Sequence, residues 1–209
     1  MTTLHDRWHQ LLEPFGVRAE TAHKTFTQLA AAYSEPGRFY HTLAHIESLL
    51  DTISVLKKQA KDLAALRLAA WFHDAVYDTR ANDNEVRSAA LAIQCLEEMN
   101  VPADIAAAVN RLILLTTNHQ CKPEDCDGCL FLDADLAILG AEPADYQQYA
   151  RQIRQEYAWV PEPDYRLGRT KVLSRFLQRP RIYYTEEMLS TREAKARLNL
   201  AEEIALLVT

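Results

Sequence analysis

The residues best suited to chemistry are histidines and aspartates that recur in short clusters along the chain. Imidazole and carboxylate together suit Mn, Fe, Zn, Co or Ni ions better than calcium, which prefers an all-oxygen shell. An adjacent His-Asp pair in an apolar segment is costly to bury unless a partner such as a metal offsets its charge. The pattern therefore predicts a divalent metal site. The clusters are His41 with His45, His73-Asp74 with Asp78, His119, and Asp133 with Asp135.

Each cluster also has an ordinary structural explanation. A single histidine such as His41 or His119 on an apolar face is usually a hydrogen-bonded core residue. The pair His73-Asp74 could form a cap or a salt bridge, and Asp133 and Asp135 could cap helices, a frequent use of aspartate. The ordered recurrence of all the clusters in one short chain favours the functional interpretation.

The order H…HD…D on successive helices resembles the HD superfamily of metal-dependent phosphohydrolases. The resemblance rests on His45, His73-Asp74 and Asp135, and it implies that these four residues bind one divalent ion, which could be Mn, Fe, Co, Ni, Zn or Mg. The longer strings RFYHTLAHI, WFHDAVYDT, NEVRSAA, DADLAILG and IRQEY resemble one bacterial subgroup of predicted HD phosphohydrolases, over roughly residues 33 to 203.

Two of these strings also resemble the guanosine tetraphosphate hydrolases. In HDAVYDT, Tyr77 stands where that family has a glutamate, which argues against its mechanism here, whereas DADLAILG favours Asp135 over Asp133 as the ligand. Asp78 lies one helical turn beyond Asp74, if the helix continues, and we expect it to orient or deprotonate a metal-bound water.

The number of metal ions affects the class of reaction. HD enzymes with two metals have further histidines between the doublet and the last aspartate, and this chain offers only His119 there. The resemblance thus favours one metal, with His41 and His119 facing the substrate. An alternative is a di-iron oxygenase on the same scaffold, and another is a non-catalytic module that binds a nucleotide.

Phosphate would have to be bound by side chains, because the five glycines form neither a P-loop nor a dinucleotide fingerprint. Arg38 and Arg154 fall within the family-like strings, and we expect both to bind phosphate oxygens of the substrate. For any single arginine or lysine, a solvated helix face is the ordinary alternative. The other basic residues considered are Arg151, Arg169 and Lys171.

The cysteines raise a separate metal hypothesis. His119, Cys121, Cys126 and Cys129 have the spacing H-x-C-x4-C-x2-C, which could form a tetrahedral zinc site. The segment lacks the paired knuckles of familiar zinc motifs. We therefore favour a surface loop that happens to carry thiols.

Helical periodicity runs through almost the whole chain, and alternating β-branched runs are absent. We expect one all-α, HD-like domain over residues 1–209 with about eight to ten helices. Its core would span about 33–140, and a C-terminal helical extension about 141–209. Helices are expected at 63–76, 86–99, 105–116, 145–160, 165–177 and 185–207, a further helix would carry both His41 and His45, and 120–129 would be a loop.

The bulk properties restrict the partners. A net charge of −6 and a pI near 5.6 argue against binding a nucleic-acid polymer. No apolar run approaches the roughly 18 residues of a membrane span, and the N-terminus does not resemble a signal peptide. We expect a cytoplasmic protein that hydrolyses a small phosphorylated substrate, most simply a nucleotide. A homodimer is compatible with a helical surface of this kind.

Overall fold

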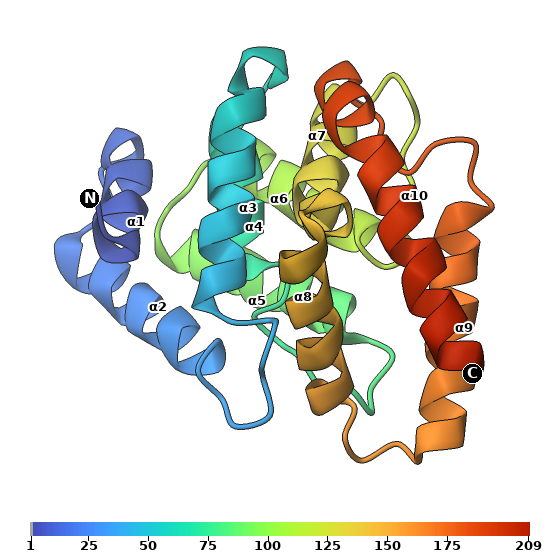
Figure 1. Ribbon diagram of the computed structural model, residues 1–209. Helices are drawn as coiled ribbons and strands as arrows, with labels where there is room; N and C mark the ends of the chain where they lie inside the picture. Colours follow the sequence, from blue (N-terminus) through green and yellow to red (C-terminus); the bar gives the residue numbers. More distant parts are fainter. Residues whose placement is uncertain (1) are drawn as a thin grey trace.

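The computed structural model describes residues 2–209, and in that part of the chain it contains ten α-helices and no strand, which confirms the expected all-α class (Figure 1). Three short 3-10 helices, Glu13–Phe15, Lys57–Gln59 and Leu136–Gly140, extend or join them. The α-helices are α1 (Leu4–Leu12), α2 (Ala19–Ala32), α3 (Leu43–Leu56), α4 (Leu63–Phe72), α5 (Asn84–Glu98), α6 (Ala103–Leu115), α7 (Cys126–Asp135), α8 (Pro143–Glu156), α9 (Glu162–Leu177) and α10 (Glu186–Val208).

Helix α4 lies at the centre of the core. Its N-cap Asp62 accepts a hydrogen bond from the Ala65 amide, and seven of its ten residues are buried. A helix that is apolar around most of its circumference must be surrounded by others, and α4 packs against α1, α3, α5, α6 and α7. In Figure 1, α1 and α2 lie on one side of this centre and α9 and α10 on the other.

The expected C-terminal extension packs closely against the segment that follows Asp135. Helix α10 contacts the 3-10 helix Leu136–Gly140, where a Cβ added to Gly140 would lie 2.6 Å from Arg192 Cβ. Helix α10 is continuous through Ser190 and Thr191, whose hydroxyls both donate to the Glu187 carbonyl. Among the described residues, no helix has the length and apolar character needed to cross a membrane.

Three helix boundaries near the candidate site differ from expectation. Helix α4 ends at Phe72 rather than at residue 76, and α3 begins at Leu43, so His41 precedes it. The expected loop 120–129 is shorter, because Asp125 caps α7 by accepting the Gly128 amide at 3.0 Å. These local ends decide where the functional side chains lie.

Candidate metal site and cavity

Three helix ends bring the predicted metal ligands together. His45 lies in the first turn of α3, His73 caps the C-terminus of α4, and Asp135 is the last residue of α7. These three residues each offer a ligand atom within 4.8 Å of the others, and they form a group that could hold a metal ion. Asp74 directly follows His73, and its Oδ2 lies 2.9 Å from His73 Nε2 and 3.9 Å from His45 Nε2.

The hydrogen bonds of His73 show that this group suits a cation. His73 Nδ1 lies 3.1 Å from the Ala70 carbonyl, which can only accept, so Nδ1 carries the hydrogen. In the neutral ring, the lone pair is then on Nε2, 3.2 Å from His45 Nε2 and 3.4 Å from Asp135 Oδ1. Ligands about 2.1 Å from one ion at tetrahedral or octahedral angles are themselves about 3.0–3.4 Å apart. The donor set therefore fits a transition-metal ion.

The charges of the group agree with its geometry. Burial raises the pKa of Asp74 and Asp135, but the neighbouring imidazoles outweigh burial and hold both below the ordinary value. Burial lowers the pKa of both His73 and His45. At His73 the two carboxylates outweigh burial and keep the pKa well above the usual range, whereas at His45 burial prevails and the pKa stays lowered. Two ionised carboxylates thus create a buried negative field that attracts positive charge.

Glu156, at the end of α8, organises the segment before α3. Its buried Oε1 accepts the backbone amides of Phe39, Tyr40 and His41 at 2.8, 2.8 and 3.0 Å. Its Oε2 accepts Tyr77 Oη at 2.9 Å and pairs with His41 Nδ1 at 2.7 Å. One carboxylate therefore fixes both the backbone of this loop and the orientation of the His41 ring.

The expectation that one helix carries both His41 and His45 was wrong. Three successive amides pointing at Glu156 hold residues 39–41 outside the helix, and Thr42 has the extended N-cap conformation with φ −120°. His41 still faces the cluster, because its Nε2 lies 4.0 Å from Asp74 Oδ2. Burial lowers the pKa of His41, but Asp74 and Glu156 together raise it above the ordinary value.

His119 reaches the cluster from the loop after α6. Its Nε2 lies 3.0 Å from Asp135 Oδ2, and its backbone has a left-handed φ of 50°, which is uncommon for a residue with a side chain. Arg179 Nη1 donates to the His119 carbonyl at 2.8 Å, and Arg179 Nη2 donates to the Asn118 carbonyl at 2.9 Å. These bonds hold the imidazole against Asp135.

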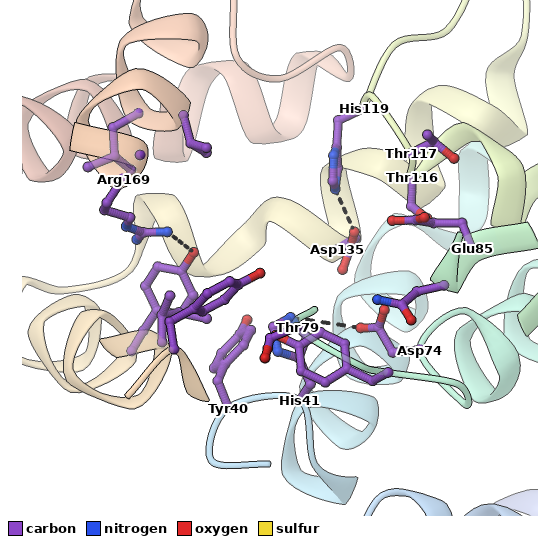
Figure 2. A pocket seen from close by; sticks show the side chains of 18 of the residues that line it. Tyr40, His41, Asp74, Thr79, Glu85, Thr116, Thr117, His119, Asp135 and Arg169 are labelled. Atoms are coloured by element: carbon purple, nitrogen blue, oxygen red, sulfur yellow. Dashed lines mark hydrogen bonds and ion pairs between the residues drawn. The ribbon is translucent and has the colours of Figure 1, made fainter. Parts of the chain in front are cut away.

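A cavity of about 690 Å³ opens beside the cluster. His41, His73, Asp74, His119 and Asp135 line one end of it. In Figure 2, Asp74, Asp135 and His119 lie on one side of this cavity, and Arg169 lies across from them. This volume is within the range of about 300–1,000 Å³ that small-molecule sites occupy.

Arg38 does not face the cavity, which corrects the expectation that it binds phosphate. Its side chain is 2% exposed, and it donates to the carbonyls of Asp74 at 2.6 Å and Ala75 at 3.1 Å. The guanidinium also lies over the rings of Tyr33 and Tyr77. Arg38 therefore anchors the chain that carries Asp74 from behind.

Arg154 is likewise not placed to bind phosphate. Its guanidinium donates to the carbonyls of Tyr157 and Val160 and pairs with Glu162 at 3.0 Å, so it closes the turn between α8 and α9. The arginine that does line the cavity is Arg169, which was considered with the others but not preferred.

Asp78 does not line the cavity, although its neighbours Tyr77 and Thr79 do, and the structure does not place its carboxylate in the cluster as expected. Because α4 ends at Phe72, no helical turn connects Asp78 to Asp74. Asp78 is exposed, its Oδ1 accepts the Arg80 amide at 2.9 Å, and its backbone exchanges two hydrogen bonds with Asn84. The residue shapes a surface turn.

We expect Asp78→Asn to have nearly wild-type turnover and metal content. Asparagine keeps an oxygen for the Arg80 amide, so the free energy of unfolding should change by no more than about 0.5 kcal/mol. Steady-state kinetics and thermal unfolding test this expectation. A hundredfold fall in turnover would show that Asp78 takes part in catalysis.

Asp133, the neighbour that DADLAILG disfavoured, has a structural role. It is fully buried and accepts the amides of Tyr184 and Thr185 at 2.8 and 2.6 Å and the Thr185 hydroxyl at 2.7 Å. Burial raises the pKa of its carboxyl to about 6 despite these bonds. Asp133 therefore fastens the start of α10 to α7.

Asp133→Asn should destabilise the fold without releasing metal. The NH2 group of the asparagine would face at least one of the three donors that bind the Asp133 carboxylate. Leaving a buried donor unsatisfied costs about 1–3 kcal/mol. Chemical unfolding and elemental analysis of the same preparation test both parts. Metal loss at an unchanged stability would contradict the assignment.

The thiols do not assemble with His119 into the considered zinc site. Cys121 Sγ and Cys129 Sγ lie 2.9 Å apart, whereas Cys126 is exposed and its Sγ donates to the Glu124 carbonyl. His119 instead directs its ring at Asp135. This arrangement agrees with the preferred interpretation of a loop that carries thiols.

Glu156 and the tyrosines of the cavity were not identified as functional from the sequence. The string IRQEY contains Glu156 and Tyr157, but Arg154 was the residue expected to act there, because phosphate attracts positive charge. The only available signal was the presence of a glutamate in a string that resembles the family pattern.

No family model, curated protein or solved structure matches this chain in the three comparisons made. The function is therefore inferred from the geometry of the site.

Proposed function

We propose that this chain is a metal-dependent phosphohydrolase of the HD type that acts on a small phosphorylated substrate such as a nucleotide. The observation that carries the proposal is the convergence of His45 Nε2, His73 Nε2 and Asp135 Oδ1, 3.2–3.4 Å apart, beside a cavity of about 690 Å³ that His73 and Asp135 line. Asp74 completes the proposed set of four ligands. Such a set supplies both the charge and the buried surroundings that phosphoryl transfer to water requires.

A divalent ion, when bound there, would activate a water molecule and polarise a phosphoryl oxygen. In the overall reaction, a bond forms between phosphorus and the water oxygen, and the bond from phosphorus to the leaving oxygen breaks. The leaving oxygen needs a proton. His41 is suited to supply it, because Glu156 fixes its Nδ1 while Nε2 faces the cluster.

The second histidine of the cavity has an orienting role in this scheme. His119 Nε2 donates to Asp135 Oδ2, which leaves Oδ1 directed at His45 and His73. Outer partners of this kind fix the geometry of a ligand and strengthen its binding. Asp78 does not line the cavity. Apart from the proposed metal ligands, the side chains that could move protons there are therefore His41 and His119.

A di-iron oxygenase and a non-catalytic binding module are the alternatives. Within the described residues, one group of three ligand residues converges. His41 and His119 lie beside this group, but His41 Nδ1 pairs with Glu156 and His119 Nε2 bonds to Asp135, and no second converging group is found among the described residues. This observation favours a single ion and hydrolysis over oxygen chemistry. Retention of all four motif residues favours catalysis over binding alone.

Phosphate release tests the proposal. Purified protein would be supplemented in turn with Mn, Fe, Co, Ni, Zn and Mg ions and assayed against a panel of nucleotides and small phosphoesters. We expect release of inorganic phosphate that depends on the ion and stops with a chelator. Oxygen uptake with iron and no phosphate release would support the oxygenase instead, and binding without turnover under every condition would support the module.

A further inference from the structure

The cavity carries little free positive charge beyond the metal cluster. Among the described residues that line it, Arg169 is the sole arginine or lysine. Its guanidinium is paired with Glu203 at 2.8 and 3.2 Å, so its charge is already offset. Glu85 and Asp164 also line the cavity and add negative charge.

This charge pattern fits one phosphoryl group and not a chain of them. A single phosphoryl group at the cluster faces a metal cation, His41 and His119. A second or third phosphate would add negative charge to a cavity that Glu85 and Asp164 also line, without free arginines or lysines to neutralise it. Proteins that hold polyphosphates surround them with lysine, arginine and metal ions.

Part of the cavity wall consists of packed tyrosines. Tyr40 packs 4.9 Å from His45 and 4.6 Å from Tyr149, measured between ring centroids, and Arg169 covers the Tyr149 ring at 5.2 Å. Arg169 Nη1 also approaches Tyr149 Oη at 3.4 Å (Figure 2). Further aromatic side chains line the cavity: Tyr157, Trp159, Tyr165 and Phe176. Flat apolar groups pack well against aromatic rings.

Gly168 leaves room beside this wall. It lines the cavity in α9, and a Cβ placed there would have no other atom within 4 Å. A large side chain at this position would occupy space that a ligand could otherwise fill. Its neighbour Leu167 is 73% exposed and does not line the cavity, so it offers a matched control.

We propose that the cavity selects a phosphate monoester with a single phosphoryl group, whose uncharged, flat aromatic portion lies against the tyrosine wall beside Gly168. The phosphoryl group would lie at the cluster beside His41 and His119, and the aromatic portion would lie toward Tyr149 and Gly168. This inference rests on the proposed function, and it restricts the substrate class of the same site.

The test uses the metal-supplemented full chain with four probes: AMP, ADP, ATP and ribose 5-phosphate, which lacks the aromatic base. We expect kcat/KM for AMP to exceed that for ribose 5-phosphate by about 5- to 100-fold, the usual range for one stacked base. AMP should exceed ADP and ATP by at least about tenfold. A preference for ADP or ATP, or equal values for AMP and ribose 5-phosphate, would overturn the inference and leave phosphohydrolysis intact.

Variants locate the aromatic subsite. Gly168→Phe should lower the ratio of kcat/KM for AMP to that for ribose 5-phosphate by about tenfold, whereas Leu167→Phe should keep the wild-type ratio. An unchanged ratio in folded Gly168→Phe would overturn the placement beside Gly168, and the wild-type comparison stands if that variant does not fold. Absence of phosphate release from all four probes and the wider panel would overturn the proposed function itself, and this inference with it.

Discussion

His73→Ala is expected to abolish metal retention and phosphate release together. His73 is 1% exposed, and its Nε2 lies within 3.4 Å of His45 Nε2, Asp74 Oδ2 and Asp135 Oδ1. Its removal takes away one ligand and the imidazole that contacts both the Asp74 and the Asp135 carboxylates. Elemental analysis after gel filtration, with phosphate release on the same sample, measures the outcome. Wild-type metal content in this variant would show that the ligand assignment is wrong.

Two further variants separate metal loss from unfolding. Asp135→Asn is nearly isosteric, and we expect it to lose metal while its circular dichroism stays that of a helical protein. His23→Ala removes an exposed histidine of α2, far in sequence from the cluster, and should retain both metal and activity. If His23→Ala released metal as readily as His73→Ala, binding would be a general property of surface imidazoles.

Glu156→Gln is expected to have the second-largest effect, with turnover lower by about two to four powers of ten. A glutamine has one acceptor oxygen, and its NH2 group would then face His41 Nδ1 and Tyr77 Oη. The His41 ring would lose its fixed orientation. The Michaelis constant should change little, because the defect lies in proton transfer. Tyr77→Phe is the matched control, since it removes one donor and leaves the pairing of Glu156 with His41.

We also expect Glu156→Gln to change how the free energy of unfolding depends on pH. Burial raises the pKa of Glu156, but bonds from His41 and the loop amides outweigh it and lower the pKa to about 2 from 4.5. A depressed pKa contributes stability above pH 4.5 that is lost as the pH falls towards 2. Unfolding experiments should therefore show a smaller loss of stability over this range in Glu156→Gln than in the wild type. Identical profiles, together with wild-type turnover, would exclude the role given to Glu156.

The helices could be predicted from the sequence for a physical reason, whereas the convergence of the ligands was implied by the resemblance to a family. Apolar residues at helical spacing identify α4 to α6 within a few residues, because burying an apolar face is the main stabilising term of these helices. His45, His73 and Asp135 lie at ends of such helices, so their packing brings the three residues together.

The loops could not be predicted in the same way, because distant partners determine them. His41 was expected in a helix, but Glu156, 115 residues later in the chain, binds the amides that a helix start would leave free. Asp78 was expected one helical turn from Asp74, but α4 ends before either residue. Arg38 donates to backbone carbonyls, and the pattern of side chains in a sequence does not indicate such acceptors.

Anomalous X-ray diffraction from crystals grown with one equivalent of Mn or Zn tests the central claim most directly. Data collected on the two sides of the absorption edge of the metal locate the ion without any assumption about activity. The account predicts one dominant peak between His45 Nε2, His73 Nε2, Asp74 Oδ2 and Asp135 Oδ1. A crystal with full metal content and its only peak elsewhere, for instance at Cys121 and Cys129, would contradict it.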